Sequence, residues 1–194
     1  MAVNPKELRH PYYTLEEYFA LEGAGHARYE YWDGELVCMS GGTEQHIRIS
    51  GSVYYSLRKQ LEGGPCESFN SELPIKTPAL PPYRYADASV VCGKPVLEKI
   101  EGFDVLTNPI LIVEVLSPSS ESRDRKEKRA AYQSLPSLME YLLVAQDAPH
   151  VTHYLRQQDS WERSDCGDLK ATVSLPSIDC VLALSDVYQG VDFG

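Results

Sequence analysis

The chain has 194 residues, of which 43% are hydrophobic and 24% charged, a size and composition typical of one compact domain. Its formal net charge of -10 argues against a protein that coats nucleic acid by bulk electrostatics, although it leaves room for a local basic patch. No apolar run approaches the roughly 18 residues of a membrane helix, and residues 1–10 lack the apolar block of a secretory signal. We therefore expect a soluble, cytoplasmic protein.

The cysteines are odd in number, widely spread and without a C-x-x-C pair. This pattern favours neither a disulfide framework nor a zinc site, so we expect buried, reduced thiols. They are Cys38, Cys66, Cys92, Cys166 and Cys180.

The N-terminal third is predicted to hold a helix, a hairpin and a second helix. Thr14, followed three residues later by Glu17, is a capping box, so a short helix begins there. Asp33-Gly34 divides the alternating run 29–39 and predicts a β-hairpin. Apolar residues recur at helical spacing over 44–61, which predicts a longer helix ended by the following Gly-Gly-Pro.

Three strands are predicted next, separated by a proline-rich segment over 78–82 and a loop over 93–108. The third strand is apolar except at Glu114, which is typical of a central strand covered on both faces. The three strands span 66–76, 83–92 and 110–116.

The C-terminal part begins with a predicted helix over 123–135, which stops near a proline, and continues with an apolar strand over 141–145. The tail alternates at 151–155 and 161–163 and is apolar at 182–184, which indicates further strands and a short terminal helix. This order predicts an α/β fold with a mixed sheet. We expect one domain, with an N-terminal extension over 1–13, a core over 14–145 and C-terminal strands over 146–194.

Two acids stand in apolar strands, where a carboxylate is out of place: Asp87 and Glu114. A buried carboxylate costs several kcal/mol unless it is paired, hydrogen-bonded or bound to a metal. An ion pair with a nearby Lys or Arg explains either acid alone about as well as a metal does. Two such acids on neighbouring strands favour a shared cation, and hard oxygen ligands select Mg2+ or Mn2+ over zinc.

The helix after Glu114 carries the densest group of basic residues in the chain. At helical spacing Arg125, Lys128 and Tyr132 share one face, so Lys128 can point back over the sheet toward the two acids. A charge run on a helix is usually a solvated face, and Arg125, Lys126 and Arg129 then meet either solvent or the phosphates of a nucleic acid.

Together these motifs resemble the Uma2 family, also called the domain of unknown function 820, within the PD-(D/E)XK nuclease superfamily. The resemblance covers nearly the whole chain. The motifs that carry it are residues 29–37 (YEYWDGELV), 44–46 (EQH), 85–92 (YADASVVC), 109–120 and 124–128 (DRKEK) followed by Tyr132.

The resemblance implies a restriction-endonuclease-like core, with a mixed sheet flanked by helices, an N-terminal helix and hairpin, and a β-rich C-terminal extension. It also implies a catalytic set of Asp87, Glu114 and Lys128, with the two acids as metal ligands and with Glu30 and His46 as accessory residues. Two positions depart from the superfamily pattern: Ala86 stands where a proline precedes the Asp, and Leu116 stands where a Lys follows the Glu. Lys128 would then replace the missing lysine.

The function implied is hydrolysis of DNA phosphodiester bonds by a Mg2+- or Mn2+-dependent endonuclease. Two other functions remain open: a catalytically weak or inactive module that binds DNA or protein, and a glycosidase that uses the two acids, which leaves Lys128 unexplained. Glu30 is otherwise an exposed hairpin acid, and His46 either contacts phosphate or caps local packing.

DNA is the expected partner, and no membrane association is expected. Nucleases that cut both strands often pair two active sites by two-fold symmetry, so a homodimer is a candidate arrangement, with the β-rich tail as a candidate interface.

Overall fold

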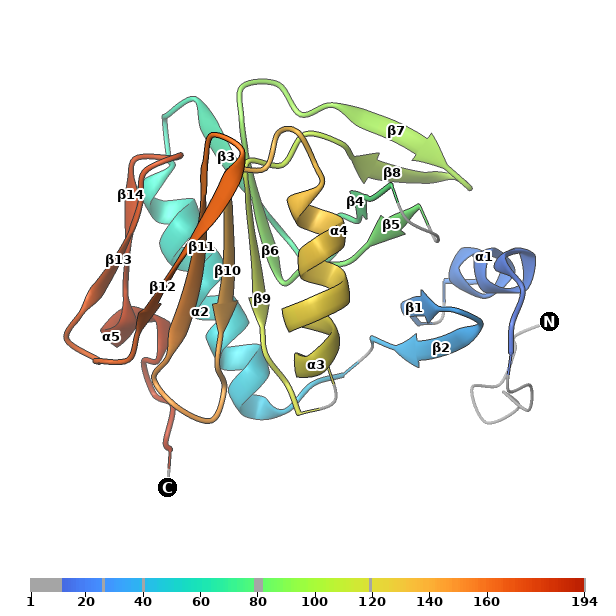
Figure 1. Ribbon diagram of the computed structural model, residues 1–194. Helices are drawn as coiled ribbons and strands as arrows, with labels where there is room; N and C mark the ends of the chain where they lie inside the picture. Colours follow the sequence, from blue (N-terminus) through green and yellow to red (C-terminus); the bar gives the residue numbers. More distant parts are fainter. Residues whose placement is uncertain (1–11, 26, 40, 79–81, 119, 194) are drawn as a thin grey trace.

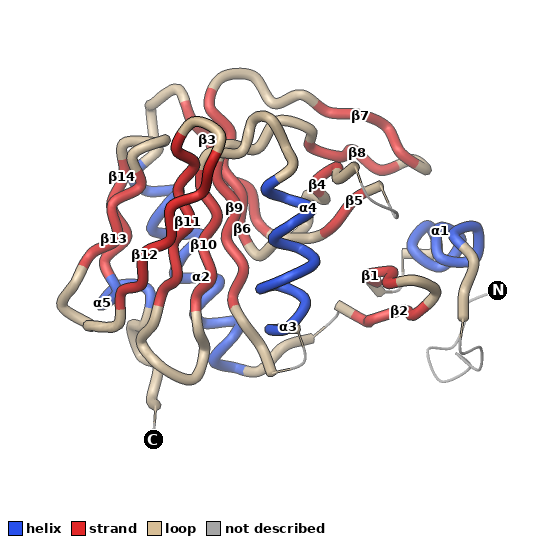
Figure 2. Tube along the Cα trace, in the orientation of Figure 1, coloured by secondary structure: helices blue, strands red, loops and turns tan. Residues whose placement is uncertain are grey.

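A computed structural model describes residues 12–25, 27–39, 41–78, 82–118 and 120–193 (Figures 1 and 2). Most of the predicted N-terminal extension, residues 1–11, lies outside the described residues, as do residues 79–81 of the proline-rich segment. The helices are α1 (Leu15–Gly23), α2 (Glu44–Gln60), α3 (Glu121–Arg123), a π-helical turn (Asp124–Lys128), α4 (Arg129–Gln133) and α5 (Leu184–Val187). The strands are β1 (Tyr29–Trp32), β2 (Glu35–Cys38), β3 (Cys66–Asn70), β4 (Ile75–Lys76), β5 (Tyr83–Arg84), β6 (Ala88–Cys92), β7 (Leu97–Ile100), β8 (Phe103–Leu106), β9 (Leu111–Val115), β10 (Glu140–Val144), β11 (Val151–Gln157), β12 (Ser160–Cys166), β13 (Thr172–Leu175) and β14 (Cys180–Ala183).

A six-stranded sheet in the order β12-β11-β10-β9-β6-β3 forms the centre of the molecule. The pair β9 and β10 is parallel, and every other neighbouring pair in this sheet is antiparallel. The predicted α/β fold with a mixed sheet is therefore confirmed. The strands β12 and β3 are the two edges of the sheet, and β9 lies inside it as predicted.

Helices cover both faces of this sheet (Figures 1 and 2). On one face α2, the hairpin β13–β14 and α5 pack over Leu111, Val113 and Val115. On the other face, the helix formed by α3, the π-turn and α4 packs over Ile112. Because strand side chains alternate between faces, Glu114 points to the same side as Ile112.

The N-terminal helix and hairpin join a four-stranded sheet of order β5-β4-β8-β7 through a cluster of aromatic residues. The buried members of this cluster, called the aromatic cluster below, are four tyrosines and one valine: Tyr18, Tyr29, Tyr83, Tyr85 and Val105. Glu22 is 3% exposed beside the cluster, and the Tyr85 hydroxyl donates a 2.7 Å hydrogen bond to its carboxylate.

The structure corrects several strand boundaries. The predicted strand over 66–76 is divided into β3 and β4, and the one over 83–92 into β5 and β6. The predicted loop over 93–108 contains the hairpin β7–β8, whose turn residues Glu101 and Gly102 both have positive φ. In the tail, β13 was not predicted.

The expectation for the cysteines is wrong in two respects. Cys66 and Cys92 form a disulfide, because the antiparallel register of β3 and β6 places them directly opposite each other. That register cannot be read from cysteine spacing. Of the remaining thiols Cys180 is buried, but Cys38 is exposed.

None of the described helices is long and apolar enough to span a membrane.

Candidate active site

Lys128 lies at the centre of a cluster of acids between the sheet and the helix that follows β9. Its side chain is 1% exposed, and its ammonium lies 2.8 Å from Glu30 Oε1, 3.3 Å from Glu114 Oε1 and 3.4 Å from Asp124 Oδ1. It also donates a 3.2 Å hydrogen bond to the backbone carbonyl of Tyr85. The residues Glu30, Glu114, Asp124 and Lys128 are called the acidic cluster below.

The position of Lys128 follows from the local backbone. The helix widens into a single π-turn at Asp124–Lys128, a feature that is frequent at functional sites. Asp124 and Lys128 are four residues apart and both are buried, as is Tyr132 four residues further on. The predicted inward face of this helix is therefore present at Lys128 and Tyr132, and Asp124 is an additional member of it. Arg125, the third predicted member, is only half-buried.

Asp87 lies immediately before β6 and not inside a strand as predicted. Its carboxylate accepts a 2.7 Å hydrogen bond from the backbone N–H of Val115, the residue after Glu114. The antiparallel register that pairs Ala88 with Val113 brings Asp87 next to Glu114. The structure thus brings the two predicted ligand acids to one place, with Lys128 against Glu114.

His46 is placed by the start of α2. The Thr43 side chain caps this helix by accepting a hydrogen bond from the backbone N–H of His46. The imidazole Nε2 then lies 3.0 Å from Asp87 Oδ1. This hydrogen bond is the main reason why the pKa of His46 is raised above its ordinary value, with burial opposing it.

Glu30 comes from the hairpin β1–β2 and is 4% exposed, so its alternative interpretation as an exposed hairpin acid is wrong. Trp32 Nε1 donates a 3.2 Å hydrogen bond to its second carboxylate oxygen. The guanidinium groups of Arg84 and Arg123 lie 4.3 and 5.5 Å from the centre of the Trp32 ring.

Burial and mutual repulsion set the protonation of the acidic cluster. Burial raises the pKa of Glu114 well above its ordinary value, and Lys128 only partly opposes this effect. Burial also raises the pKa of Asp124. For Lys128 burial alone would lower the pKa, but Glu114, Glu30 and Asp124 outweigh it and hold the pKa well above its ordinary value. Lys128 therefore stays positively charged. Three acids surround it, Glu30, Glu114 and Asp124, so one lysine cannot neutralise them all.

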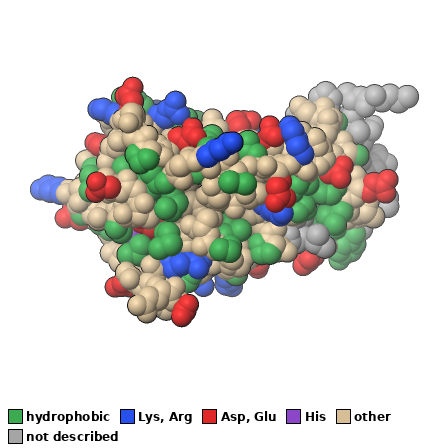
Figure 3. All heavy atoms as spheres, turned by 90° about the horizontal axis from the view of Figure 1, so that it is seen from above, with side chains coloured by type: hydrophobic (Ala, Val, Ile, Leu, Met, Phe, Trp, Pro, Cys, Tyr) green, Lys and Arg blue, Asp and Glu red, His purple; other side chains and the backbone are tan. Residues whose placement is uncertain are grey.

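The three basic residues predicted to contact nucleic acid do not point to one place. Arg125 Nε forms an ion pair with the Glu121 carboxylate at 2.7 Å. Arg129 Nη1 donates a 2.9 Å hydrogen bond to the hydroxyl of Tyr154, a residue of the central sheet. Lys126 is exposed. On the face of the molecule seen in Figure 3, basic and acidic side chains are interspersed.

Asp124, Trp32 and Arg84 are candidate site residues that sequence reasoning did not single out. Asp124 could have been recognised, because it lies four residues before Lys128 on the same helix. The positions of Trp32 and Arg84 depend on how the hairpin packs, which leaves no pattern in the sequence.

The described residues contain no group of three or more His, Cys, Asp or Glu side chains arranged to hold a metal ion. The chemistry of the donor set still fits a hard cation, because four carboxylates face one lysine and one histidine. Glu30 Oε1 and Asp124 Oδ1 are buried, and both lie within ion-pair distance of Lys128.

Comparisons with known proteins agree with this architecture. The family model for Uma2, described as "Putative restriction endonuclease", matches residues 15–185. A Synechocystis sp. protein, "Uncharacterized protein slr1290", is 34% identical over 189 residues, which cover 94% of this chain and 95% of the relative. A second, "Uncharacterized protein sll1609", is 30% identical over 146 residues, covering 75% and 82%.

A solved structure shares the fold. It is a crystal structure of "a putative nuclease belonging to DUF820" from Anabaena variabilis, with a TM-score of 0.69 and 20% identity. The match covers 91% of this chain and 97% of that one.

Proposed function

Because the chain belongs to the Uma2 family, we propose that it is a metal-dependent endonuclease that hydrolyses DNA phosphodiester bonds at Asp87, Glu114 and Lys128. The observation that carries the proposal is the buried contact between Lys128 and Glu114, in a cluster that also gathers Glu30 and Asp124. A buried set with excess acids is stable only if protons or a cation balance it.

Asp87 and Glu114 are the proposed ligands of a Mg2+ or Mn2+ ion. Two carboxylates suffice for Mg2+, which usually keeps several waters and takes its other oxygens from substrate phosphates. When bound, the ion lowers the pKa of a water and polarises the phosphodiester. The other catalytic roles, positioning and stabilisation of charge, are assigned to the protein's own side chains.

Lys128 is the proposed stabiliser of the negative charge that develops on the phosphate. Its charge is fixed by the surrounding acids, and its position is fixed by the π-turn and by the Tyr85 carbonyl. The Val115 N–H holds the Asp87 carboxylate in one orientation, and His46 occupies its other oxygen. The geometry of the site is thus set before substrate binds.

Glu30 and His46 are proposed accessory residues. Glu30 is held by Lys128 and by the Trp32 indole, so it positions the lysine. His46 touches only one of the predicted ligands and positions Asp87. Arg125, Lys126 and Arg129 are the proposed contacts to the DNA backbone, with Lys126 the most accessible of them.

The test is cleavage of plasmid, single-stranded and branched DNA in Mg2+ or Mn2+. We expect nicking that a chelator abolishes and that falls by about 100-fold or more in Lys128→Met. The matched control is Lys170→Met, which removes an exposed lysine that belongs neither to the acidic cluster nor to the proposed DNA contacts and keeps catalysis.

Lys128→Met leaves buried acids without their cation and costs about 3–5 kcal/mol of folding free energy, so a second variant is needed. Asp87→Asn keeps the shape of the side chain, and circular dichroism checks that it is folded. Wild-type protein that cuts none of these DNAs in either ion would contradict the proposal. If it still bound DNA, the inactive binding module would replace it.

A further inference from the structure

The outward side of α2 carries a row of exposed residues that the candidate active site does not use. Residues Ile49, Val53 and Leu57 face the core, and His46 faces Asp87. The opposite side of the helix presents a row that we call the outer stripe. It consists of Glu44, Ile47, Gly51, Tyr55 and Arg58, all of them exposed.

Two members of the outer stripe are large and apolar. Ile47 is 59% exposed and Tyr55 is 65% exposed. Val181 of β14, 50% exposed, lies beside the end of the same helix, where its backbone exchanges two hydrogen bonds with the Gln60 side chain. A single exposed apolar residue needs no explanation, but three large ones on α2 and the neighbouring β14 favour a surface that another molecule covers.

Gly51 is the second observation. A glycine inside a helix costs about 1 kcal/mol relative to alanine. The chain itself gives no steric reason for it, because a Cβ built at Gly51 would meet nothing within 4 Å. A helical glycine on the outside allows the backbone of another helix to approach closely, so this position points to an intermolecular contact.

The outer stripe is arranged symmetrically about Gly51. Ile47 and Tyr55 lie four residues before and after it, and Glu44 and Arg58 lie seven residues before and after it. In an antiparallel pair of such helices related by a two-fold axis at Gly51, Ile47 meets Tyr55 of the second copy, and Glu44 meets Arg58. Glu44 also forms an ion pair with Arg48 of its own helix, so its carboxylate would be shared between the two arginines. The acidic first turn of each helix then faces the basic last turn of the other.

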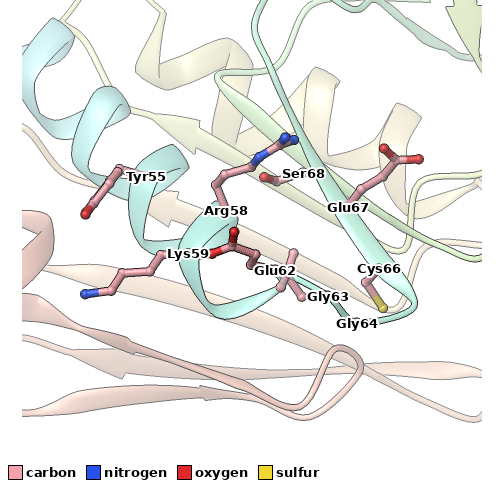
Figure 4. A pocket seen from close by; sticks show the side chains of 10 residues that line it. Tyr55, Arg58, Lys59, Glu62, Gly63, Gly64, Cys66, Glu67 and Ser68 are labelled. Carbon is pink, nitrogen blue, oxygen red and sulfur yellow. The ribbon is translucent and has the colours of Figure 1, made fainter.

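A hollow of about 570 Å³ lies beside the C-terminal half of α2, and Tyr55 and Arg58 line it (Figure 4). The side chains of Lys59 and Glu62 from the helix end and of Ser68 from β3 complete this part of its wall. In the antiparallel arrangement the Ile47 and Glu44 side chains of a second copy reach this position. The hollow offers space for Ile47 of the second copy next to Tyr55, and Arg58 offers a positive charge to Glu44 of the second copy.

We propose that two copies of this chain associate through antiparallel packing of their α2 helices about a two-fold axis at Gly51. The occupant of the outer stripe is a second copy, because the charged and apolar residues of the stripe lie at equal spacings on either side of Gly51 and so pair with each other about a two-fold axis. The proposed interface is separate from the acidic cluster, so it does not rest on the proposed nuclease activity.

The first test is the oligomeric state of the wild-type protein by sedimentation over a wide range of concentration. We expect a concentration-dependent dimer, and Gly51→Leu is expected to raise its dissociation constant by about tenfold or more. Leucine is a better helix former than glycine, so this variant keeps or improves the stability of the monomer while it weakens the dimer. Lys170→Glu, exposed on the turn before β13, is the control and leaves the dimer unchanged.

The second test fixes the register. Arg58→Glu alone and Glu44→Lys alone each place like charges opposite each other at both ends of the pair, so each protein is expected to be monomeric. Mixed in equal amounts they restore both attractive pairs, and a heterodimer of one copy of each is expected.

Three results would overturn the proposal. The first is a wild-type protein that stays monomeric, which would leave the stripe to another kind of partner. The second is a dimer that Gly51→Leu does not weaken. The third is a mixture of the two charge variants that does not associate.

Discussion

Lys128 is held by acids that come from three separate parts of the chain: a hairpin, a central strand and its own helix. The sequence indicated Asp87 and Glu114, because an acid among apolar strand residues is conspicuous. Lys128 was indicated by its place on the helix face that points toward these acids, whereas Glu30 was reached only through the resemblance to a family. Asp124 was overlooked, because on a helix rich in charges an acid looks like part of a solvated face, although its spacing of four residues from Lys128 places it on the same side of the helix.

Glu22 gives a test of burial at the level of one residue. Burial is the main cause that raises its pKa above the ordinary value of 4.5, although the Tyr29 N–H and the Tyr85 hydroxyl both bond the carboxylate and oppose it. With a folded-state pKa above the unfolded one, the stabilising contribution of Glu22 is complete below the unfolded pKa. It is lost as the pH rises through the folded pKa.

We therefore expect Glu22→Gln to gain stability relative to wild type as the pH rises from about 4 to about 7, because glutamine does not ionise. Urea unfolding of both proteins at several pH values measures this difference. Glu16→Gln, an exposed position on the same helix, controls for the substitution itself. A loss of stability by Glu22→Gln relative to wild type as the pH rises over this range would contradict the assignment.

At the scale of elements, turn chemistry explains which hairpins could be predicted. The turn at Asp33 and Gly34 has positive φ at both residues, and Asp-Gly is the pair that such a turn favours. The turn at Glu101 and Gly102 has the same backbone signs, but glutamate is uncommon at such a position, so the hairpin β7–β8 gave no signal.

The disulfide between β3 and β6 gives a prediction for these two strands. It closes a loop across a sequence separation of 26 residues, which restricts the unfolded chain. The chain-entropy relation then gives about 3.5 kcal/mol of stabilisation. We expect a reductant to lower the free energy of unfolding by about that amount, as measured by urea denaturation.

The control is the double variant Cys66→Ala and Cys92→Ala, whose stability should not respond to the reductant. Equal responses of the wild type and this variant would show that the Cys66–Cys92 bond contributes no measurable stability.

At the scale of the whole molecule, the order of elements predicted the mixed sheet and its central strand. It did not predict that α1, the hairpin β1–β2 and the β5-β4-β8-β7 sheet meet in a separate aromatic cluster. These contacts join residues far apart in sequence, so no local pattern identifies which elements meet.

The net charge of -10 and the few proposed phosphate contacts predict a shallow salt dependence of DNA binding. With three contacts, at Arg125, Lys126 and Arg129, the slope of log K against log salt is expected near -3. Binding of labelled duplex to the Asp87→Asn variant, followed by fluorescence anisotropy, measures the slope. Lys126→Met should reduce it by about one, whereas Lys170→Met should not. A slope of about -6 or steeper would require a larger basic surface than the one proposed.

The edge strand β12 has a consequence for how copies of the molecule can meet. An open sheet edge is a template for another strand, and uncontrolled pairing there leads to aggregation. Along β12 the exposed positions are largely polar or charged, and Glu162, Arg163 and Asp165 are among them. Such side chains discourage the joining of two sheets into one longer sheet. This protection favours association through another surface, such as the interface proposed on α2.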